Sequence, residues 1–533
     1  MVGGMAFSSE GMMKRFLMFV LFAAVALTVC GKEAKYVILL IGDGMSTPQR
    51  MIADEFSRKA GHGDLAINTL PVHATTRTCS ANSLVTDSAA SATAIACGVK
   101  TDNGMLGVDP RGARLESVAE VARDRGKKVG IVTSVTLNHA TPGGFYGHRR
   151  SRSESYALGL DLVASKFDFF GGGGIAKYNE KQPDIYTLAG KSGYAVAVGK
   201  SAMDALRPGQ KAIVLAKSLD QAMPYAIDGQ ENMPTLDEIT AKAIAMLDGP
   251  QGFFLMVEGG AIDWAGHSND AATNLREMLA FDKAAKVALA FYAKHPDETL
   301  IVTTGDHETG GMSMGFAGSG YAMYMERLVN QKCSAAKFAE AVKKAQKANP
   351  GLAFEDVKPM LAERFGFRFV PDGRKFITAG EVNCVRAMLR KKPDASFSAV
   401  KQQLEKKQGV VFGDKARIGD AELRFLVDAV KADGKASAAD LQQRMQEKFG
   451  FEILPDDPMR ITETEDRQLR AAFKSGKLAD AARVIISGKA GIGWTSGSHT
   501  ALPTLTTSIG VHSEKFSGFL DNTDIAKKLK SIL

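Results

Sequence analysis

The stretch YVILLIGDGM, residues 36–45, is an apolar run that ends in a Gly-Asp-Gly turn. Three later stretches have the same form, namely KKVGIVTS (127–134), FFLMVEGG (253–260) and TLIVTTGDH (299–307). Such runs, rich in β-branched or aromatic residues and ending in polar ones, predict buried strands followed by turns. Helical patterns lie between them, as in RLESVAEVARDRG (114–126) and NLREMLAFDKAAKVALAFYAKH (274–295). We therefore expect an α/β fold of three layers, with a central, mostly parallel β-sheet flanked by helices.

Polar residues at the ends of these strands are candidates for a functional site. In open parallel sheets, ligands bind at the carboxyl ends of the strands. Asp43, Glu258 and the adjacent pair Asp306 and His307 all follow such strands directly. The pattern predicts that these side chains gather at one edge of the sheet.

The positive charge of the chain is concentrated in one segment. The 533 residues are 45% hydrophobic and 24% charged, with a net charge of +8. Residues 332–489 carry 31 Lys and Arg against 22 Asp and Glu, which leaves 36 against 37 for the rest. Because no DNA-binding motif or interleaved aromatic residue accompanies these cations, we interpret them as a solvated helical surface and expect no nucleic-acid partner.

The same segment contains an internal repeat. ERFGFRFVPDGRKFITAGEVNCVRAML (363–389) aligns with EKFGFEILPDDPMRITETEDRQLRAAF (447–473), 84 residues later. Two copies are too few for a solenoid. We expect a basic helical insertion over 321–489 that interrupts an α/β core formed by residues 34–320 and 490–533. A lid, an interface or a plain surface contact are open roles for this insertion.

The N-terminal residues 1–30 have the features of an export signal. Lys14 and Arg15 precede the apolar run FLMFVLFAAVALTV (16–29), which is too short to span a bilayer. The sequence LTVCG (27–31) is similar to a lipoprotein cleavage box, although Val29 is bulky for it. We expect an exported, periplasmic or secreted protein without a transmembrane span. Plain cleavage and a lipid anchor at Cys30, as in an outer-membrane lipoprotein, are both open.

A candidate nucleophile lies in LVTDSAASATAIACGVKT, residues 84–101. Asp87 and Ser88 precede a run of small residues, and a packed helix with an ordinary N-cap would explain this pattern by itself. The alternative is that Ser88 is a nucleophile at a helix N-terminus, where anions are favoured. A serine needs a base or a metal for activation, which other parts of the chain must supply.

Three of the nine histidines stand in a pattern typical of metal ligands. Asp263 and His267 are four residues apart, which places them on one face of a helix. Asp306 and His307 form a pair, and His499 lies in SGSHT (496–500). Carboxylates and imidazoles are the ligands of catalytic zinc, and acids clustered this closely need cations. Together with Asp43 and Glu258, these residues predict a metal site.

Six ordered motifs resemble those of the alkaline phosphatases. They are LLIGDGM (39–45), VTDSAASATA (85–94), HATPGG (139–144) followed by Arg152, VEGGAIDWAGH (257–267), TTGDHETGG (303–311) and SGSHT (496–500). The resemblance extends from residue 36 to about residue 503, with the basic insertion between the last two motifs.

The resemblance implies a role for each matching residue. Ser88 is expected to be the phosphorylated nucleophile and Arg152 to bind the phosphate oxygens, with Asp87 holding the guanidinium. Two Zn²⁺ and one Mg²⁺ are implied as cofactors. Their implied ligands are Asp263, His267 and His499 for one zinc, Asp43, Asp306 and His307 for the zinc beside Ser88, and Asp43, Thr141 and Glu258 for magnesium.

Two positions depart from some members of the family. His139 stands where some relatives carry Asp, and Trp264 stands where some carry Lys or His. Both positions lie near the magnesium and the phosphate in the family. The identity of the third metal is therefore open. Whether the protein forms a homodimer is also open, because the insertion has no counterpart that we can match.

The activity implied by the resemblance is hydrolysis of phosphate monoesters, with broad specificity, through a phosphoserine. A diesterase of the same superfamily is the alternative enzyme, although four residues favour monoesters, namely Ser88, Thr141, Arg152 and Glu258. A sulfatase is not favoured, because its nucleophile motif is missing. The remaining alternative is an exported binding protein on a catalytically silent scaffold, but every expected ligand is present.

Overall fold

A ten-stranded β-sheet forms the centre of the protein. The computed structural model describes residues 33–229, 231–316, 319, 321–371, 373–413 and 416–533. Every neighbouring pair in the sheet is parallel except those of β15, which runs antiparallel to both neighbours. In spatial order the strands are β16 (Gly518–Asp521), β2 (Val72–Arg77), β15 (Thr504–Gly510), β8 (Thr299–Gly305), β1 (Tyr36–Gly42), β7 (Phe253–Gly259), β3 (Lys128–Thr133), β4 (Phe169–Gly172), β6 (Lys211–Leu215) and β5 (Tyr194–Val198).

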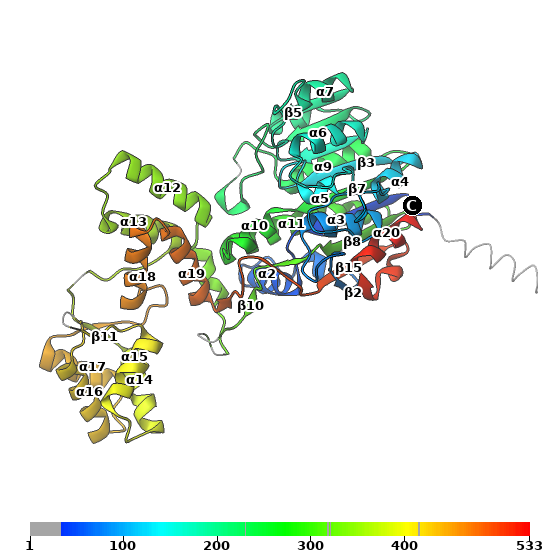
Figure 1. Ribbon diagram of the computed structural model, residues 1–533. Coiled ribbons are helices and arrows are strands. Elements are labelled where there is room, and N and C mark those ends of the chain that lie inside the picture. Colours follow the sequence, from blue (N-terminus) through cyan, green and yellow to red (C-terminus); the bar gives the residue numbers. More distant parts are fainter. Residues whose placement is uncertain (1–32, 230, 317–318, 320, 372, 414–415) are drawn as a thin grey trace, which may run out of the picture.

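Helices cover both faces of this sheet, so the sheet is buried on both sides (Figure 1). Along β1, Ile38 and Leu40 pack into one hydrophobic cluster, whereas Leu39 and its neighbours Val37 and Ile41 pack into the other. This alternation follows from the two-residue period of a strand, and it explains why β1 is apolar throughout. The expected three-layer α/β fold is confirmed.

Helices of the α/β core contribute residues to these two clusters. Residues of α2 (Thr47–Lys59), α9 (Leu236–Leu247) and α11 (Ala271–Tyr292) belong to the first cluster, and residues of α4 (Val118–Asp124) and α20 (Asn522–Lys530) belong to the second. The other core helices are α3 (Ser88–Cys97), α5 (Ala140–Gly143), α6 (Ser155–Ala164), α7 (Ile185–Lys191), α8 (Lys200–Ala205) and α10 (Ala261–His267).

The chain between β10 (Ser313–Met314) and β13 (Ile492–Gly493) is mostly helical. These two short strands pair with each other, so the chain leaves and re-enters the core at one place. The helices between them are α12 (Ala335–Ala348), α13 (Phe354–Phe365), α14 (Ala379–Lys391), α15 (Phe397–Gln408), α16 (Asp420–Ala432), α17 (Ala438–Phe449), α18 (Glu463–Lys474) and α19 (Leu478–Ala490).

These eight helices form two lobes that exchange halves of the repeat. The repeat extends beyond the two aligned stretches, because α12 to α15 recur as α16 to α19, with helix starts 81 to 85 residues apart. The proximal lobe contains α12 and α13 of the first copy together with α18 and α19 of the second, and its buried residues continue the first cluster of the core. The distal lobe contains α14 to α17, around a separate hydrophobic cluster. Figure 1 shows the distal lobe far from the sheet. Each copy therefore contributes two helices to each lobe.

Two chain segments connect the lobes and lie side by side. The strands β11 (Phe376–Thr378) and β12 (Glu452–Leu454) pair in parallel, and Arg368 forms a bridge with Arg460. Equivalent residues of the two copies are 84 apart, so Phe376 corresponds to Arg460 and Arg368 corresponds to Glu452. The pairing of Phe376 with Glu452 and the bridge between Arg368 and Arg460 are therefore related by a local two-fold pseudosymmetry. We call these paired segments the waist of the insertion.

Other features concern the chain ends and the cysteines. The expected signal sequence, with its candidate lipidation residue Cys30, lies outside the described residues. Within the described residues, none of the helices combines the length and the apolar character that crossing a bilayer requires. The four cysteines of that part, Cys79, Cys97, Cys333 and Cys384, are free thiols.

Candidate active site

The first candidate metal group consists of Asp263, His267 and His499. Asp263 and His267 lie one turn apart on α10, and His499 lies on β14 (His499–Thr500), far away in the sequence. Nε2 of His267 is 3.4 Å from Oδ2 of Asp263, and Nε2 of His499 is 3.5 Å from Oδ1 of the same carboxylate. The side chain of His267 is 40% exposed, so this group borders the solvent.

Backbone carbonyl groups orient both of these imidazoles. Nδ1 of His267 is 2.8 Å from the carbonyl oxygen of Gly497, and Nδ1 of His499 is 2.8 Å from that of Thr86. A carbonyl can only accept, so each Nδ1 carries the proton and each Nε2 has a free lone pair. The two Nε2 atoms are 3.1 Å apart, as expected for two ligands that face one cation.

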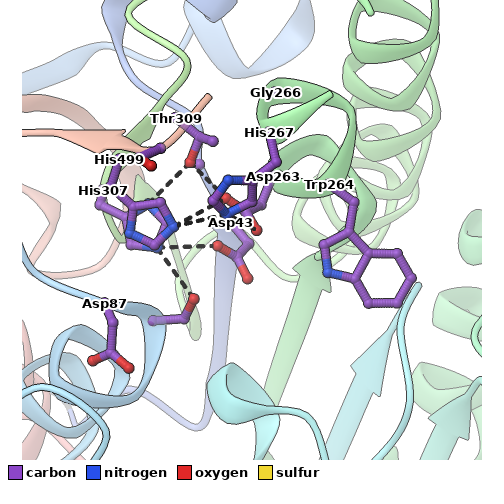
Figure 2. Close-up of polar contacts among 12 residues, drawn as sticks. Asp43, Asp87, Asp263, Trp264, Gly266, His267, His307, Thr309 and His499 are labelled. Atoms are coloured by element: carbon purple, nitrogen blue, oxygen red, sulfur yellow. Dashed lines mark hydrogen bonds and ion pairs between the residues drawn. The ribbon is translucent and has the colours of Figure 1, made fainter. Parts of the chain in front are cut away.

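The second group consists of Asp43, Asp306 and His307, which are all fully buried. Asp43 follows β1, and Asp306 and His307 follow β8, the neighbouring strand. Nε2 of His307 is 3.3 Å from Oδ1 of Asp43 and 3.3 Å from Oδ2 of Asp306. The ring of His307 stacks on that of His499, with 3.7 Å between their centroids, so the first two groups adjoin each other (Figure 2).

The third group consists of Asp43, His139 and Glu258. Oγ1 of Thr141 donates to Oδ2 of Asp43 at 3.3 Å, and the hydroxyl of Thr133 donates to Oε2 of Glu258. Thr141 therefore lies beside this group, as expected, but an imidazole is present as well. His139 directly precedes α5, which carries Thr141. The family resemblance places His139 near the magnesium but does not imply that it is a ligand.

Electrostatics in these groups disfavour the charged forms of several acids. Burial raises the pKa of Glu258 to about 8 and that of Asp306 to about 7. Burial, followed by repulsion from neighbouring carboxylates, raises the pKa of Asp43 well above its ordinary value. The pKa of Asp263 is lowered, because its hydrogen bond with His499 and the nearby imidazoles outweigh its burial. Bound cations would remove the penalty on the raised groups.

Several buried atoms here point to ligands beyond the protein itself. Within the described part of the chain, four buried polar atoms of these groups have no hydrogen-bond partner, namely Oδ1 of Asp43, Nδ1 of His139, Oε1 of Glu258 and Oδ2 of Asp306. Buried polar groups are nearly always satisfied, so such a set needs an explanation. Carboxylate and imidazole donors with free lone pairs fit metal ions.

Ser88 lies at the first position of α3, next to the second group. Asp87 is the N-cap of this helix, and its Oδ1 accepts from the backbone N–H of Ala90 at 3.0 Å. Oγ of Ser88 is 3.2 Å from Nε2 of His307. All ten residues of α3 are buried and most are Ala, Ser or Thr, so the helix packs closely and brings Ser88 to the metal groups.

Arg152 lies near Ser88 and contacts both Asp87 and His139. Its Nη1 donates to Oδ2 of Asp87 at 3.1 Å, and its Nη2 lies 3.2 Å from Nε2 of His139. Burial lowers the pKa of His139 to about 4, so its ring is neutral and one of its two nitrogens has a free lone pair. Trp264 packs edge-on against His139, with 5.8 Å between the ring centroids. Arg149 and Arg150 are engaged elsewhere, with Asp161 and with the carbonyl of Arg111.

The sequence motifs predict His139 at this site but do not mark it as a metal ligand, although its position two residues before Thr141 in HATPGG is a usable signal. They do not indicate Glu308, directly after His307. No spacing rule singles it out, because its role depends on partners that are distant in the sequence.

Comparisons with known proteins agree with this geometry. The family model described as alkaline phosphatase matches residues 34–166 and 189–533. Alkaline phosphatase 3 of Bacillus subtilis is 29% identical over 511 residues, which cover 93% of this chain and 88% of the relative. Alkaline phosphatase 4 of the same organism is 35% identical over 301 residues, or 54% of this chain and 64% of the relative.

A solved structure is similar along nearly its whole length. The cold-active alkaline phosphatase from a psychrophilic Shewanella species has a TM-score of 0.66 and 26% identity, with 93% of this chain and 99% of that chain covered. The fold and the site define a phosphatase enzyme of a metal-dependent class. The chain belongs to the alkaline phosphatase family.

Proposed function

We propose that this protein hydrolyses phosphate monoesters to an alcohol and inorganic phosphate through a phosphoserine at Ser88. The observation that carries the proposal is the distance of 3.2 Å between Oγ of Ser88 and Nε2 of His307, beside three groups of metal-ligand type. A serine in this position is activated without a dedicated base when cations lie next to it.

The cofactors of this proposal are two Zn²⁺ and one Mg²⁺. The zinc ligands are Asp263, His267 and His499 in one site, and Asp43, Asp306 and His307 in the other. Asp43, Thr141 and Glu258 would hold the magnesium, and a ring nitrogen of His139 lies beside the same two carboxylates. When bound, the metals supply positive charge that stabilises the Ser88 oxyanion and the leaving oxygen and lowers the pKa of a water.

The residues of the chain divide the remaining work. Ser88 gives its hydroxyl proton to solvent, its oxygen forms a bond to phosphorus while the ester P–O bond breaks, and the leaving alkoxide takes a proton from solvent. A water oxygen then attacks the phosphoserine and gives a proton to solvent, while the P–Oγ bond breaks and Oγ regains a proton. Arg152 donates two parallel N–H groups to the phosphate oxygens in both steps, because its planar fork fits them.

Broad specificity follows from which part of the substrate these residues contact. Ser88, Arg152 and the metal ligands all address the phosphoryl group, and His267 at the solvent border leaves the alcohol unconstrained. The substrates are therefore small-molecule phosphate monoesters.

The cellular setting is also part of the proposal. We infer an exported protein, periplasmic or secreted, with the segment 321–489 as an insertion into an α/β core of 34–320 and 490–533. Support for the insertion comes from the pairing of β10 with β13. A lipid anchor at Cys30 and a homodimer stay open predictions, which mass spectrometry of the mature protein and light scattering can test.

The test is release of p-nitrophenol from p-nitrophenyl phosphate at alkaline pH. We expect turnover by the protein loaded with zinc and magnesium, and loss of turnover after EDTA that added metal reverses. Cleavage of bis-p-nitrophenyl phosphate in preference to the monoester would instead establish a diesterase. Metal binding without turnover of either ester would leave a binding protein.

A further inference from the structure

Glu308 is a fully buried carboxylate that lies outside all three metal groups. It occupies β9 (Glu308–Thr309), directly after His307. The chemistry proposed above does not use it, because no metal group includes its oxygens. A buried carboxylate is costly unless its oxygens are satisfied, so its surroundings require an explanation.

Hydrogen-bond donors surround both oxygens of Glu308. Oε1 accepts from Nε2 of Gln49 at 2.6 Å and from the backbone N–H of Met312 at 3.2 Å. Oε2 accepts from the backbone N–H of Gly311 at 3.0 Å and from the hydroxyl of Thr500. Within the described part of the chain, four hydrogen-bond donors face this side chain, two on each oxygen, so both oxygens are satisfied as acceptors.

These donors belong to the segments that carry the metal ligands. Thr500 follows His499, and β14 pairs with β9 so that His499 is opposite Thr309 and Thr500 is opposite Glu308. Gln49 lies on α2, which begins shortly after Asp43, and its Nε2 also donates to the carbonyl of Thr309 at 3.1 Å. One carboxylate thus joins the segments of Asp43, His307 and His499.

The partner of Glu308 on α2 is itself fixed. Oε1 of Gln49 accepts from the backbone N–H of Ser46 at 3.1 Å, so its amide cannot turn over without losing this bond and the bond to Thr309. Ser46 lies three residues after Asp43, and its hydroxyl donates to the carbonyl of Pro503 at 2.7 Å. A chain of hydrogen bonds therefore runs from the Asp43 turn to the segment that follows β14.

We propose that Glu308 is a positioning residue that holds His499 and His307 at the spacing their metal ions require. Metal sites tolerate only small displacements of their ligands, and loss of an outer partner typically lowers metal affinity or activity by about 10- to 100-fold. The proposal rests on the metal-dependent function above, but it concerns metal retention rather than turnover.

The test compares the rate at which metal-loaded variants release zinc to the chromogenic chelator 4-(2-pyridylazo)resorcinol. We expect release that is about 10- to 100-fold faster for Glu308→Ala, and less acceleration for Thr500→Val, which removes one donor of four. With excess zinc, kcat of Glu308→Ala should return toward the wild-type value with little change in KM. Thr500→Val keeps the test valid if Glu308→Ala does not fold.

Two control variants separate positioning from general destabilisation. Glu120 in α4 is also a buried carboxylate, which accepts from the backbone N–H of Ser117, and Thr240 in α9 is a buried threonine whose hydroxyl donates to the carbonyl of Leu236 at 2.7 Å. Glu120→Ala should lower the unfolding temperature, and neither Glu120→Ala nor Thr240→Val should accelerate zinc release.

The outcomes distinguish this proposal from the proposed function. Wild-type release rates in both Glu308→Ala and Thr500→Val, or equal acceleration in the controls, would overturn the positioning role. A wild-type protein that binds zinc but hydrolyses no ester would overturn the proposed function alone, because zinc release is measured without substrate.

Discussion

The Asp87 side chain joins the helix of Ser88 to Arg152. Its Oδ1 accepts from the N–H of Ala90 and so caps α3, at whose first position Ser88 lies, while its Oδ2 accepts from Nη1 of Arg152 at 3.1 Å. One carboxylate thus sets both the start of the helix and the place of the guanidinium. Asp87 therefore helps to set the distance between the Ser88 oxygen and the Arg152 guanidinium, together with the contact between Arg152 and His139.

Substitutions at this pair should be strongly non-additive. We expect Arg152→Ala to lower kcat/KM by about 10- to 100-fold, because a charge-assisted fork to the phosphate is lost. Asp87→Ala should lower kcat/KM by a smaller factor. The kcat/KM of the double variant should be close to that of Arg152→Ala, since Asp87 acts largely through Arg152. A double-mutant cycle in steady-state kinetics measures this coupling. Arg150→Ala is the control, because its guanidinium is exposed and bound to the carbonyl of Arg111; fully additive losses would show that the two residues act independently.

Removal of the Ser88 hydroxyl should abolish turnover and leave the fold intact. Ser88→Ala removes one oxygen at a position where no backbone bond depends on it, so the unfolding temperature and the zinc content should stay close to wild type. We expect kcat to fall by about 10³-fold or more, because an activated nucleophile is lost. Ser165→Ala, a serine whose hydroxyl bonds the carbonyl of Leu162, should retain activity. Near-normal activity of Ser88→Ala would require water to attack the ester directly.

Glu277 should make the protein less stable as the pH rises. Burial raises its pKa from 4.5 to about 7, although the N–H of Ala226 donates to it. The pKa of Glu277 is higher in the folded protein than in the unfolded chain. Its destabilising effect on folding is therefore absent well below pH 4.5, grows up to pH 7 and is constant above. At about 1.4 kcal/mol per pKa unit, the full cost is about 3 kcal/mol.

The isosteric variant Glu277→Gln tests this dependence. Its free energy of unfolding, relative to wild type, should increase between pH 4.5 and pH 7 in urea titrations. The matched control is Glu340→Gln, which removes an exposed charge on α12 and should show no such trend. If the free energies of unfolding of wild type and Glu277→Gln changed in parallel with pH, Glu277 would not be the cause of the lower stability at higher pH.

Each copy of the repeat contributes two helices to each lobe, so two different deletions in this segment should differ in their effect on folding. The backbone N–H of Glu452 donates to the carbonyl of Lys375 at 2.9 Å, so a short glycine linker can replace residues 376–451 and remove the distal lobe alone. We expect that variant to fold and to keep its phosphatase activity. Deletion of 420–490, which contains four helices of the second copy, should leave both lobes half-built and produce aggregates in size-exclusion chromatography. Equal folding of the two variants would contradict the shared-lobe arrangement.

The fold and much of the site could be predicted from local patterns. The apolar runs of β1, β7 and β8 are buried on both faces, which is why their sequences lack alternation and why their polar ends stand out. Asp263 and His267 follow from the helical period. The meeting of Asp43, Asp306 and His307 follows from the rule for the carboxyl ends of parallel strands. Their roles as metal ligands stay part of the proposed function.

Other features could not be derived in this way. The contacts of Glu308 depend on the pairing of β9 with β14, which are nearly two hundred residues apart. The ring of His139 enters the third group because of the turn before α5, and a single sequence does not show the direction of that turn. The repeat was visible, but the exchange of its halves was not, because each helix pair could equally well have packed on its own copy.

The waist of the insertion has a mechanical consequence. Because the chain passes between the lobes twice and the two passages are hydrogen-bonded side by side, a pull on the distal lobe loads two strands at once rather than one. The same doubling recurs at β10 and β13, where the insertion joins the core. Tension applied at the far end would be divided between two chain segments at both junctions.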